Sequence, residues 1–245
     1  MRWHIRGGLL LAGLMPSLMG PSTAGAASRM SDAPPTLRFF GWATPNSQRV
    51  SIMLEELGLA YTAQGVNIRA RAQFTPEILA LNPYGKIPIL VETPPRGPPL
   101  VLFESGAILL HLAERHGRFL PGAADARGTT LAWLMVVLTS LGPFTGQAHH
   151  WTELAQDQPE IAQTHSVALV TRVYRLLEAR LAEVPYLAGD DYSIVDIAAY
   201  PWIARHAWAW QSLDDYPHLA AWFARVGARS GIQAGMQVPA GARLD

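Results

Sequence analysis

The sequence predicts an α/β part with a mixed four-stranded sheet, followed by an all-α part. Between residues 37 and 116, short apolar runs typical of strands alternate with amphipathic runs typical of helices. Phe119-Leu120-Pro121-Gly122 indicates a linker, and beyond it strand signals disappear and helical periodicity dominates. With 49% hydrophobic and 16% charged residues, the 245-residue chain is globular and can bury a sizeable core. We expect domains at residues 36–119 and 123–238 and a tail at 239–245.

Residues 1–30 are predicted to lie outside the fold. Arg2 and Arg6 precede an apolar run at 9–19, and Ala24-Gly25-Ala26 supplies small residues for cleavage, which is the outline of a secretory signal peptide. The run is too short and too interrupted for a membrane span. The alternative is a translation start at Met30. The first interpretation predicts export to the periplasm with cleavage near Ala26, and the second predicts a cytoplasmic protein.

The α/β part is predicted to begin with a strand at 37–40, a helix closed by Gly58 and a strand at 61–68. Thr75-Pro76-Glu77 supplies an N-cap, a first-turn proline and an acidic residue for a short helix through Leu81. Strands at 87–91 and 100–103 form a hairpin around a proline-rich turn, and a helix at 104–116 ends at Gly117. This order of elements predicts a mixed sheet with helices packed against it.

The second part is predicted to contain helices at 128–147, 160–183, 193–210 and 218–228, with turns at Pro185, Gly189 and Pro217. Ser193 followed by Asp196 fits a capping box, in which both side chains satisfy free backbone amides at a helix start. We therefore assign Asp196 a folding role and no catalytic role.

Composition limits the chemistry that the chain can perform. The 19 basic residues equal the 19 acidic ones, so no global field favours nucleic acid or an anionic membrane. Cysteine is absent, so any thiol chemistry needs a thiol that the ligand supplies. His149 and His150 do not share a helix face and have no third ligand at a suitable spacing, so we expect them to line a pocket or support the fold, with no metal site.

Two short motifs suggest a binding edge for a peptide. Proline is poorly tolerated inside a central strand, so Pro88 ahead of an apolar run suggests a cis-prolyl turn that exposes backbone groups to a ligand. Glu104-Ser105 indicates a helix start, whose free amides suit a carboxylate.

The chain from about residue 37 to 238 resembles the glutathione transferases, which combine a thioredoxin-like first domain with a helical second domain. More narrowly, it resembles the bacterial Nu-class branch, which includes glutathione-dependent disulfide-bond oxidoreductases. The motifs that carry this resemblance are Thr44-Pro45-Asn46, Gln73-Phe74, Asn82-Pro83-Tyr84-Gly85-Lys86-Ile87-Pro88, the run Leu102 to Leu109 and the run Leu141 to His150.

The resemblance implies a glutathione site. Thr44 and Asn46 are implied to face the glutathione sulfur, where a hydroxyl or amide donor lowers the thiol pKa by stabilising the thiolate. The alternative is that both residues only cap the following helix. The rest of the tripeptide is implied to lie along the sheet edge: the Ile87 backbone next to Pro88 for the cysteinyl group, Glu104 and Ser105 for the γ-glutamyl end, and Gln73 and Lys86 for the glycyl end.

Two positions depart from the branch pattern. Ser47 replaces the usual glycine after Asn46, and the next basic residue is Arg49; both are tolerable at a helix start. His165 stands where the branch commonly has an arginine that crosses the dimer to the partner's glutathione, with Arg172 as an alternative. Histidine is shorter and only partly charged, so weaker glutathione binding is expected.

The resemblance therefore implies a homodimeric enzyme that reduces disulfides with the glutathione thiolate or conjugates electrophiles, as in detoxification. Trp151 and Trp208 are the candidates for the acceptor-substrate site. No metal, nucleic-acid or membrane partner is expected. The alternative is a non-catalytic glutathione-binding or regulatory module of the same fold, since fold does not establish activity.

Overall fold

The computed structural model describes residues 34–243. The segment at 1–30, for which a signal peptide or an upstream extension is predicted, lies outside the described residues.

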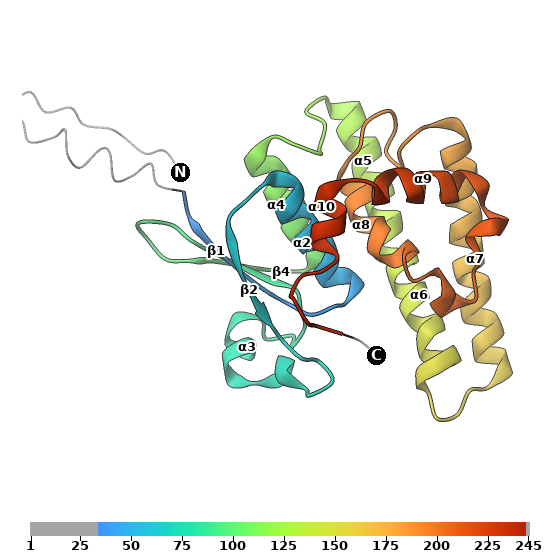
Figure 1. Cartoon of the computed structure of the whole chain (residues 1–245), viewed down its shortest axis with the longest axis horizontal. Helices are drawn as coiled ribbons and strands as arrows, with labels where there is room; N and C mark the ends of the chain where they lie inside the picture. The colour runs from blue at the N-terminus through green and yellow to red at the C-terminus, as the bar shows by residue number, and fades with distance from the viewer. Residues whose placement is uncertain (1–33, 244–245) are drawn as a thin grey trace, which may run out of the picture. The chain divides into compact units, whose positions relative to one another are not determined.

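The sheet contains β1 (Thr36–Gly41), β2 (Tyr61–Gly65), β3 (Ile89–Thr93) and β4 (Leu100–Phe103), in the order β2-β1-β3-β4 (Figure 1). β1 runs parallel to β2, whereas β3 is antiparallel to both β1 and β4. The predicted mixed four-stranded sheet is confirmed. β2 is shorter than predicted because Asn67 Oδ1 accepts from the amides of Arg69 and Ala70 at 3.0 and 3.2 Å, which turns the chain away from the sheet.

Helices cover both faces of this sheet. On one face lie α2 (Pro45–Leu57) and α4 (Ser105–His116), and on the other lie the 3₁₀ turn η1 (Ala72–Phe74) and α3 (Pro76–Leu81). Phe39 belongs to the first core and its neighbour Phe40 to the second, since successive strand side chains point to opposite faces. Gly58 closes α2 with φ 67°, as predicted.

Two predicted helix starts differ in detail. Thr75 occupies the N-cap position of α3, but its hydroxyl donates backward to the carbonyl of Ala72 at 3.0 Å and caps no amide. Glu104 precedes α4 instead of belonging to it, and has φ 69°.

The second half is helical, as predicted. Its first helix is longer than expected, because α5 (Ala124–Val136) continues through a π turn, η2 (Val137–Leu141), into α6 (Gly142–His149) and a second π turn, η3 (His150–Leu154). By length and composition Ala124–Leu154 could cross a membrane; in the described structure it packs against α7 (Glu160–Glu183) and α8 (Ile194–Ile203). The remaining elements are η4 (His206–Ala209), η5 (Leu213–Asp215), α9 (Pro217–Gly227) and α10 (Ser230–Gly235).

The predicted helix at 193–210 is interrupted. The Arg205 guanidinium donates to the carbonyl of Pro201 at 2.9 Å, and the Arg205 amide donates to the carbonyl of Trp202 at 3.1 Å. Helix α8 therefore ends here, and η4 follows. The capping box at its start is confirmed. Asp196 is buried and accepts from Ser193, from the Leu187 amide and from Trp222 Nε1.

One core joins the two halves. Helix α10, which was not predicted, packs on α2, and the Ser51 hydroxyl donates to the carbonyl of Gly235 at 2.7 Å. The chain after α10 then returns to the sheet half, where Trp42 Nε1 donates to the carbonyl of Arg243 at 2.8 Å. Helix α2 is therefore held by the helical half, which fixes the position of its N-terminus.

Candidate active site

A small cavity of about 100 Å³ lies where three segments of the sheet half meet. These segments are the N-terminus of α2, the turn before β3 and the start of α4. Six of the predicted site residues line it together with Asn82: Asn46, Lys86, Ile87, Pro88, Glu104 and Ser105.

The start of α4 forms one wall of this cavity. The positive φ of Glu104 turns the chain sharply ahead of the helix, so exposed Glu104 and buried Ser105 follow one another along the wall. The first amides of α4 have no partner in the preceding turn of the helix, and the helix dipole gives this end a partial positive charge. This wall therefore offers a carboxylate beside hydrogen-bond donors.

The turn before β3 forms a second wall. The Ile87-Pro88 bond is cis, as predicted. The ladder between β1 and β3 begins only at Ile89, so Ile87 precedes the paired part of the strand. Asn82 is buried and holds this turn: its Nδ2 donates to the carbonyl of Lys86 at 2.7 Å and its Oδ1 accepts from the Tyr84 amide at 3.1 Å. The sequence indicated no role for Asn82, although this residue begins the motif that ends at Pro88.

Asn46 completes the cavity at the N-terminus of α2. Its Oδ1 accepts from Trp202 Nε1 in α8 at 3.2 Å, and its Nδ2 donors have no acceptor among the described residues. Trp202 was not predicted as a site residue, because 156 positions separate it from Asn46.

Thr44 does not line the cavity. Its Oγ1 accepts from the Ser47 amide at 3.3 Å and donates to the Ser47 hydroxyl at 3.0 Å. Ser47 Oγ in turn accepts from the Trp42 amide at 3.3 Å. Thr44 is therefore the N-cap of α2 in this structure, the alternative that the sequence left open, and Ser47 engages its hydroxyl.

Gln73 lies in η1, outside the lining of the cavity, and its Oε1 is buried without a partner among the described residues. Lys86 is exposed, with its Nζ 4.5 Å from the centre of the Tyr84 ring. The two residues predicted for the glycyl end therefore differ in position, and only Lys86 borders the cavity.

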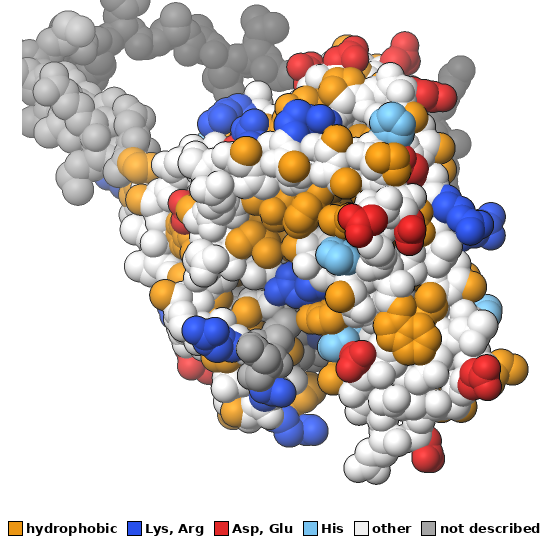
Figure 2. All heavy atoms as spheres, turned by 45° about the vertical axis from the view of Figure 1, so that its right-hand side comes forward, with side chains coloured by type: hydrophobic (Ala, Val, Ile, Leu, Met, Phe, Trp, Pro, Cys, Tyr) orange, Lys and Arg blue, Asp and Glu red, His pale blue; other side chains and the backbone are white. Residues whose placement is uncertain are grey.

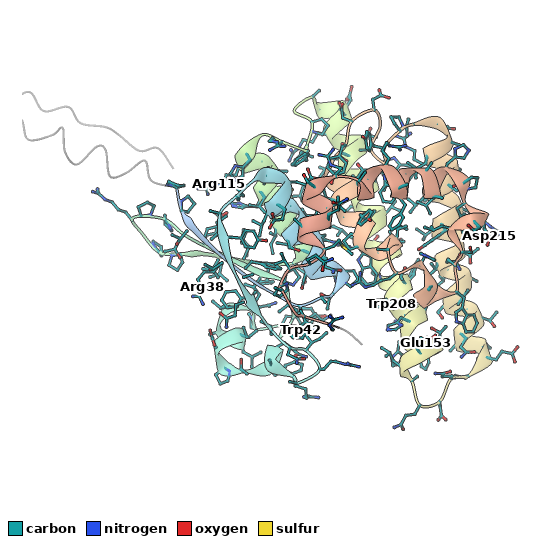
Figure 3. The ribbon with its side chains drawn as sticks, viewed as in Figure 1. Arg38, Trp42, Arg115, Glu153, Trp208 and Asp215 are labelled. Carbon is teal, nitrogen blue, oxygen red and sulfur yellow. The ribbon has the colours of Figure 1, made fainter. Side chains whose placement is uncertain are left out.

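A second cavity of about 490 Å³ lies between the two halves of the chain, and two of its lining residues, Ala43 and Gln48, flank Asn46 in the sequence. Its lining residues come from the loop after β1, from α2, from the end of α6 and the following turn, from η4 and from the C-terminal segment: Ala43, Gln48, His149, Leu154, Arg205, Trp208, Met236, Ala242 and Arg243. Of the two residues predicted for the acceptor site, Trp208 lines this cavity and Trp151 does not. Figure 3 places Trp208 on the helical half and Trp42, just before Ala43, on the sheet half.

Stacked rings and a half-buried cation characterise this second cavity. The His149 and Trp208 rings stack with centroids 4.0 Å apart, and the Arg205 guanidinium lies 5.1 Å from the Trp208 ring centre. Arg205 also donates to the carbonyl of Ala43 at 2.9 Å, which ties η4 to the loop beside Asn46. Burial lowers the pKa of Arg205 to about 10 and also lowers the pKa of His149. On the face that Figure 2 presents, Lys or Arg and His side chains lie among hydrophobic ones.

The two predicted cross-dimer residues lie on α7, away from the small cavity. His165 is exposed. Arg172 borders a third, apolar cavity of about 710 Å³ that also contains Trp210. Neither residue contacts the predicted glutathione residues within the single chain, and residues 34–243 contain no cluster of His, Asp and Glu suited to a metal.

Comparison with known proteins identifies the family. Residues 43–115 match the family model for the glutathione S-transferase N-terminal domain, and residues 129–230 match that for the C-terminal domain. The disulfide-bond oxidoreductase YfcG of Escherichia coli strain K12 is 41% identical over 191 residues, which cover 76% of this chain and 87% of that protein.

Solved structures agree. A glutathione transferase from Burkholderia graminis, with two glutathione molecules bound per subunit, has a TM-score of 0.79 at 32% identity and covers 92% of this chain and 100% of its own. One from Pseudomonas putida, with one glutathione disulfide bound per subunit, has a TM-score of 0.76 at 33% identity, covering 87% and 96%. The chain therefore belongs to the glutathione S-transferase family, and to the Nu-class branch that its motifs resemble.

Proposed function

We propose that this protein binds glutathione in the small cavity and uses its thiolate to reduce disulfides. The observation that carries the proposal is the convergence of Asn46, Ile87-Pro88 and Glu104-Ser105 on one cavity, in a chain without cysteine. The names of the relatives support it, since one is a disulfide-bond oxidoreductase and others bind glutathione or its disulfide.

In this proposal each wall of the cavity holds one part of the tripeptide. The Glu104 carboxylate pairs with the γ-glutamyl ammonium, while Ser105 and the first amides of α4 receive its carboxylate. The Ile87 backbone pairs with the cysteinyl group in the manner of an added strand. Lys86, which borders the cavity, pairs with the glycyl carboxylate. Asn46 Nδ2 then donates to the sulfur and favours the thiolate.

The reaction consists of two thiol–disulfide exchanges. The glutathione thiolate attacks one sulfur of the substrate disulfide, so that a mixed disulfide forms and the other substrate sulfur leaves as a thiolate that takes a proton. A second glutathione thiolate attacks the glutathione sulfur of the mixed disulfide, which releases glutathione disulfide and the second substrate thiol. The protein supplies no sulfur in either step.

We assign the acceptor substrate to the second cavity. Two arginines and no acidic residue line its described part, together with apolar Leu154, Met236 and Trp208. This lining suits an acceptor that combines an apolar body with a carboxylate. Conjugation of an electrophile, the reaction class of detoxification, uses the same thiolate and remains the second candidate. Family membership also supports a homodimer, which light scattering after size-exclusion chromatography tests.

Calorimetry and two activity assays test the proposal. We expect reduced glutathione to bind, hydroxyethyl disulfide to be reduced faster than chlorodinitrobenzene is conjugated, and Asn46→Ala to slow both reactions. Absence of binding at millimolar glutathione would refute the proposal. Tight binding without turnover in either assay would favour a non-catalytic glutathione-binding module instead.

A further inference from the structure

Arg49 is a fully buried arginine directly behind the small cavity. It lies in the second turn of α2, and only 2% of its surface is exposed. Its Nη1 donates to Ser105 Oγ at 3.3 Å, whereas Nε and Nη2 are buried without a partner among the described residues. Burial lowers the pKa of Arg49 to about 9, against the opposing attraction of Glu104.

Such a side chain is costly to the folded protein. A buried charge needs a counter-charge or a full set of hydrogen bonds, and residues 34–243 place no carboxylate within ion-pair distance of Arg49. Glu104, whose negative charge attracts Arg49, lines the cavity and makes no ion pair with it. A side chain that only filled space at this position would be apolar, because an apolar residue would leave no donors unsatisfied.

Ser105 connects this cation to the cavity. Because Ser105 Oγ accepts from Arg49, one of its lone pairs is occupied; its single proton has no acceptor within residues 34–243 and can be donated into the cavity. The positive guanidinium also polarises that hydroxyl and adds to the partial charge at the start of α4. Together these groups favour a ligand carboxylate that accepts a hydrogen bond from the Ser105 hydroxyl.

We propose that Arg49 is a positioning residue that selects the α-carboxylate of the γ-glutamyl end, acting through Ser105. This role rests on the proposed glutathione site. In the complex the ligand carboxylate supplies the counter-charge that Arg49 lacks among the described residues. Arg49 and Glu104 together therefore recognise the carboxylate and the ammonium of an amino-acid end. Ligands that lack this carboxylate are discriminated against.

Two ligands and three variants test the role. Glutathione is compared by calorimetry with γ-aminobutyryl-cysteinylglycine, which is the same molecule without the α-carboxylate. For Arg49→Met we expect glutathione affinity to fall by about tenfold or more, as for a lost hydrogen bond to a charged group, with the affinity for the analogue unchanged. Arg49→Lys keeps the charge and is expected to retain most of the discrimination. Arg180→Met is the matched control, since Arg180 donates to the carbonyls of Leu187 and Ala188 far from the cavity.

An equal loss for both ligands in Arg49→Met, or no loss for either, would overturn the role. If Arg49→Met does not fold, the wild-type protein gives the answer: the Arg49 Nε–H resonance, assigned with the Lys variant, is expected to shift with glutathione and not with the analogue. A shift with both ligands, or with neither, refutes the role. Failure of wild-type protein to bind glutathione at all is a distinct result, which refutes the glutathione site itself.

Discussion

The hydrogen bond from Trp202 to Asn46 gives the sharpest test of how the site orients the side chain that donates to the glutathione thiolate. Trp202→Phe removes the indole N–H that donates to Asn46 Oδ1 at 3.2 Å and keeps a ring at a position that is 8% exposed. This bond is at the long end of the N–H···O range, so its net worth is about 0.5–1 kcal/mol. If this bond also orients Asn46 in the transition state, its loss lowers kcat/KM by about two- to fivefold.

Asn46→Ala sets the upper limit for this effect. It removes the hydrogen bond to the thiolate itself, which is worth about 1.5–3 kcal/mol for a charged acceptor. We therefore expect kcat/KM for disulfide reduction to fall by roughly 10- to 150-fold. The pKa of bound glutathione should rise by about one to two units, since one unit corresponds to about 1.4 kcal/mol. The thiolate absorbance of the bound ligand, followed against pH, measures this shift.

The double variant decides whether Trp202 acts through Asn46. In the Asn46→Ala background there is no amide left to orient, so Trp202→Phe is expected to have no further effect on kcat/KM. Trp133→Phe, a half-buried tryptophan under the Arg180 guanidinium, is the matched control. Urea unfolding checks that each variant is folded. Equal effects of Trp202→Phe in both backgrounds would refute the positioning role and leave only packing.

Three further predictions concern the frame around the site. Thr44→Ala is expected to lower the free energy of unfolding by about 1 kcal/mol, as for a lost N-cap, and to leave kcat/KM nearly unchanged; a loss of activity near that of Asn46→Ala would restore Thr44 as a thiol donor. Gly235→Ala places a Cβ 2.4 Å from the Ile52 Cα, and should cost about 1–3 kcal/mol in urea unfolding. Gly122→Ala, with no atom within 4 Å, should cost little, and equal costs would contradict the packing of α10 on α2. Burial lowers the pKa of His149 below its unfolded value, so the unfolded state binds the extra proton first and stability falls as pH drops below about 6.5. His149→Gln should flatten that slope, and an unchanged slope would exclude His149 as its source.

Much of the fold follows from local patterns. Gly58 and Gly117 end their helices in the left-handed conformation, and Ser193 with Asp196 forms the capping box, because each of these signals acts over a few residues of backbone. The predicted cis bond at Pro88 is present for a similar reason. In two places where prediction failed, a side chain redirected the backbone: Asn67 shortened β2, and Arg205 ended α8.

The site could be predicted only in outline. The motifs named Asn46, Ile87-Pro88 and Glu104-Ser105, and these residues do line one cavity. The sequence could not separate Asn46 from Thr44, since both residue types are favoured as helix caps. Only the position of Ser47 beside the Thr44 hydroxyl, and of Trp202 beside the Asn46 amide, distinguishes the two.

By itself, the sequence determined the mixed four-stranded sheet followed by a helical half, and the family. It also determined the need for a thiol that the ligand supplies, because zero cysteines leave no other source. Only the tertiary structure decided which side chains support the site. Arg49 meets Ser105 across 56 positions, and Arg205 meets Ala43 across 162. In the sequence Arg49 is an ordinary basic residue at a helix start. Once the helix is packed, Arg49 loses its hydration, and its guanidinium donates to Ser105 in the cavity wall. The physical reason is that burial and partners arise from packing between distant elements, which a pattern of neighbouring residues does not encode.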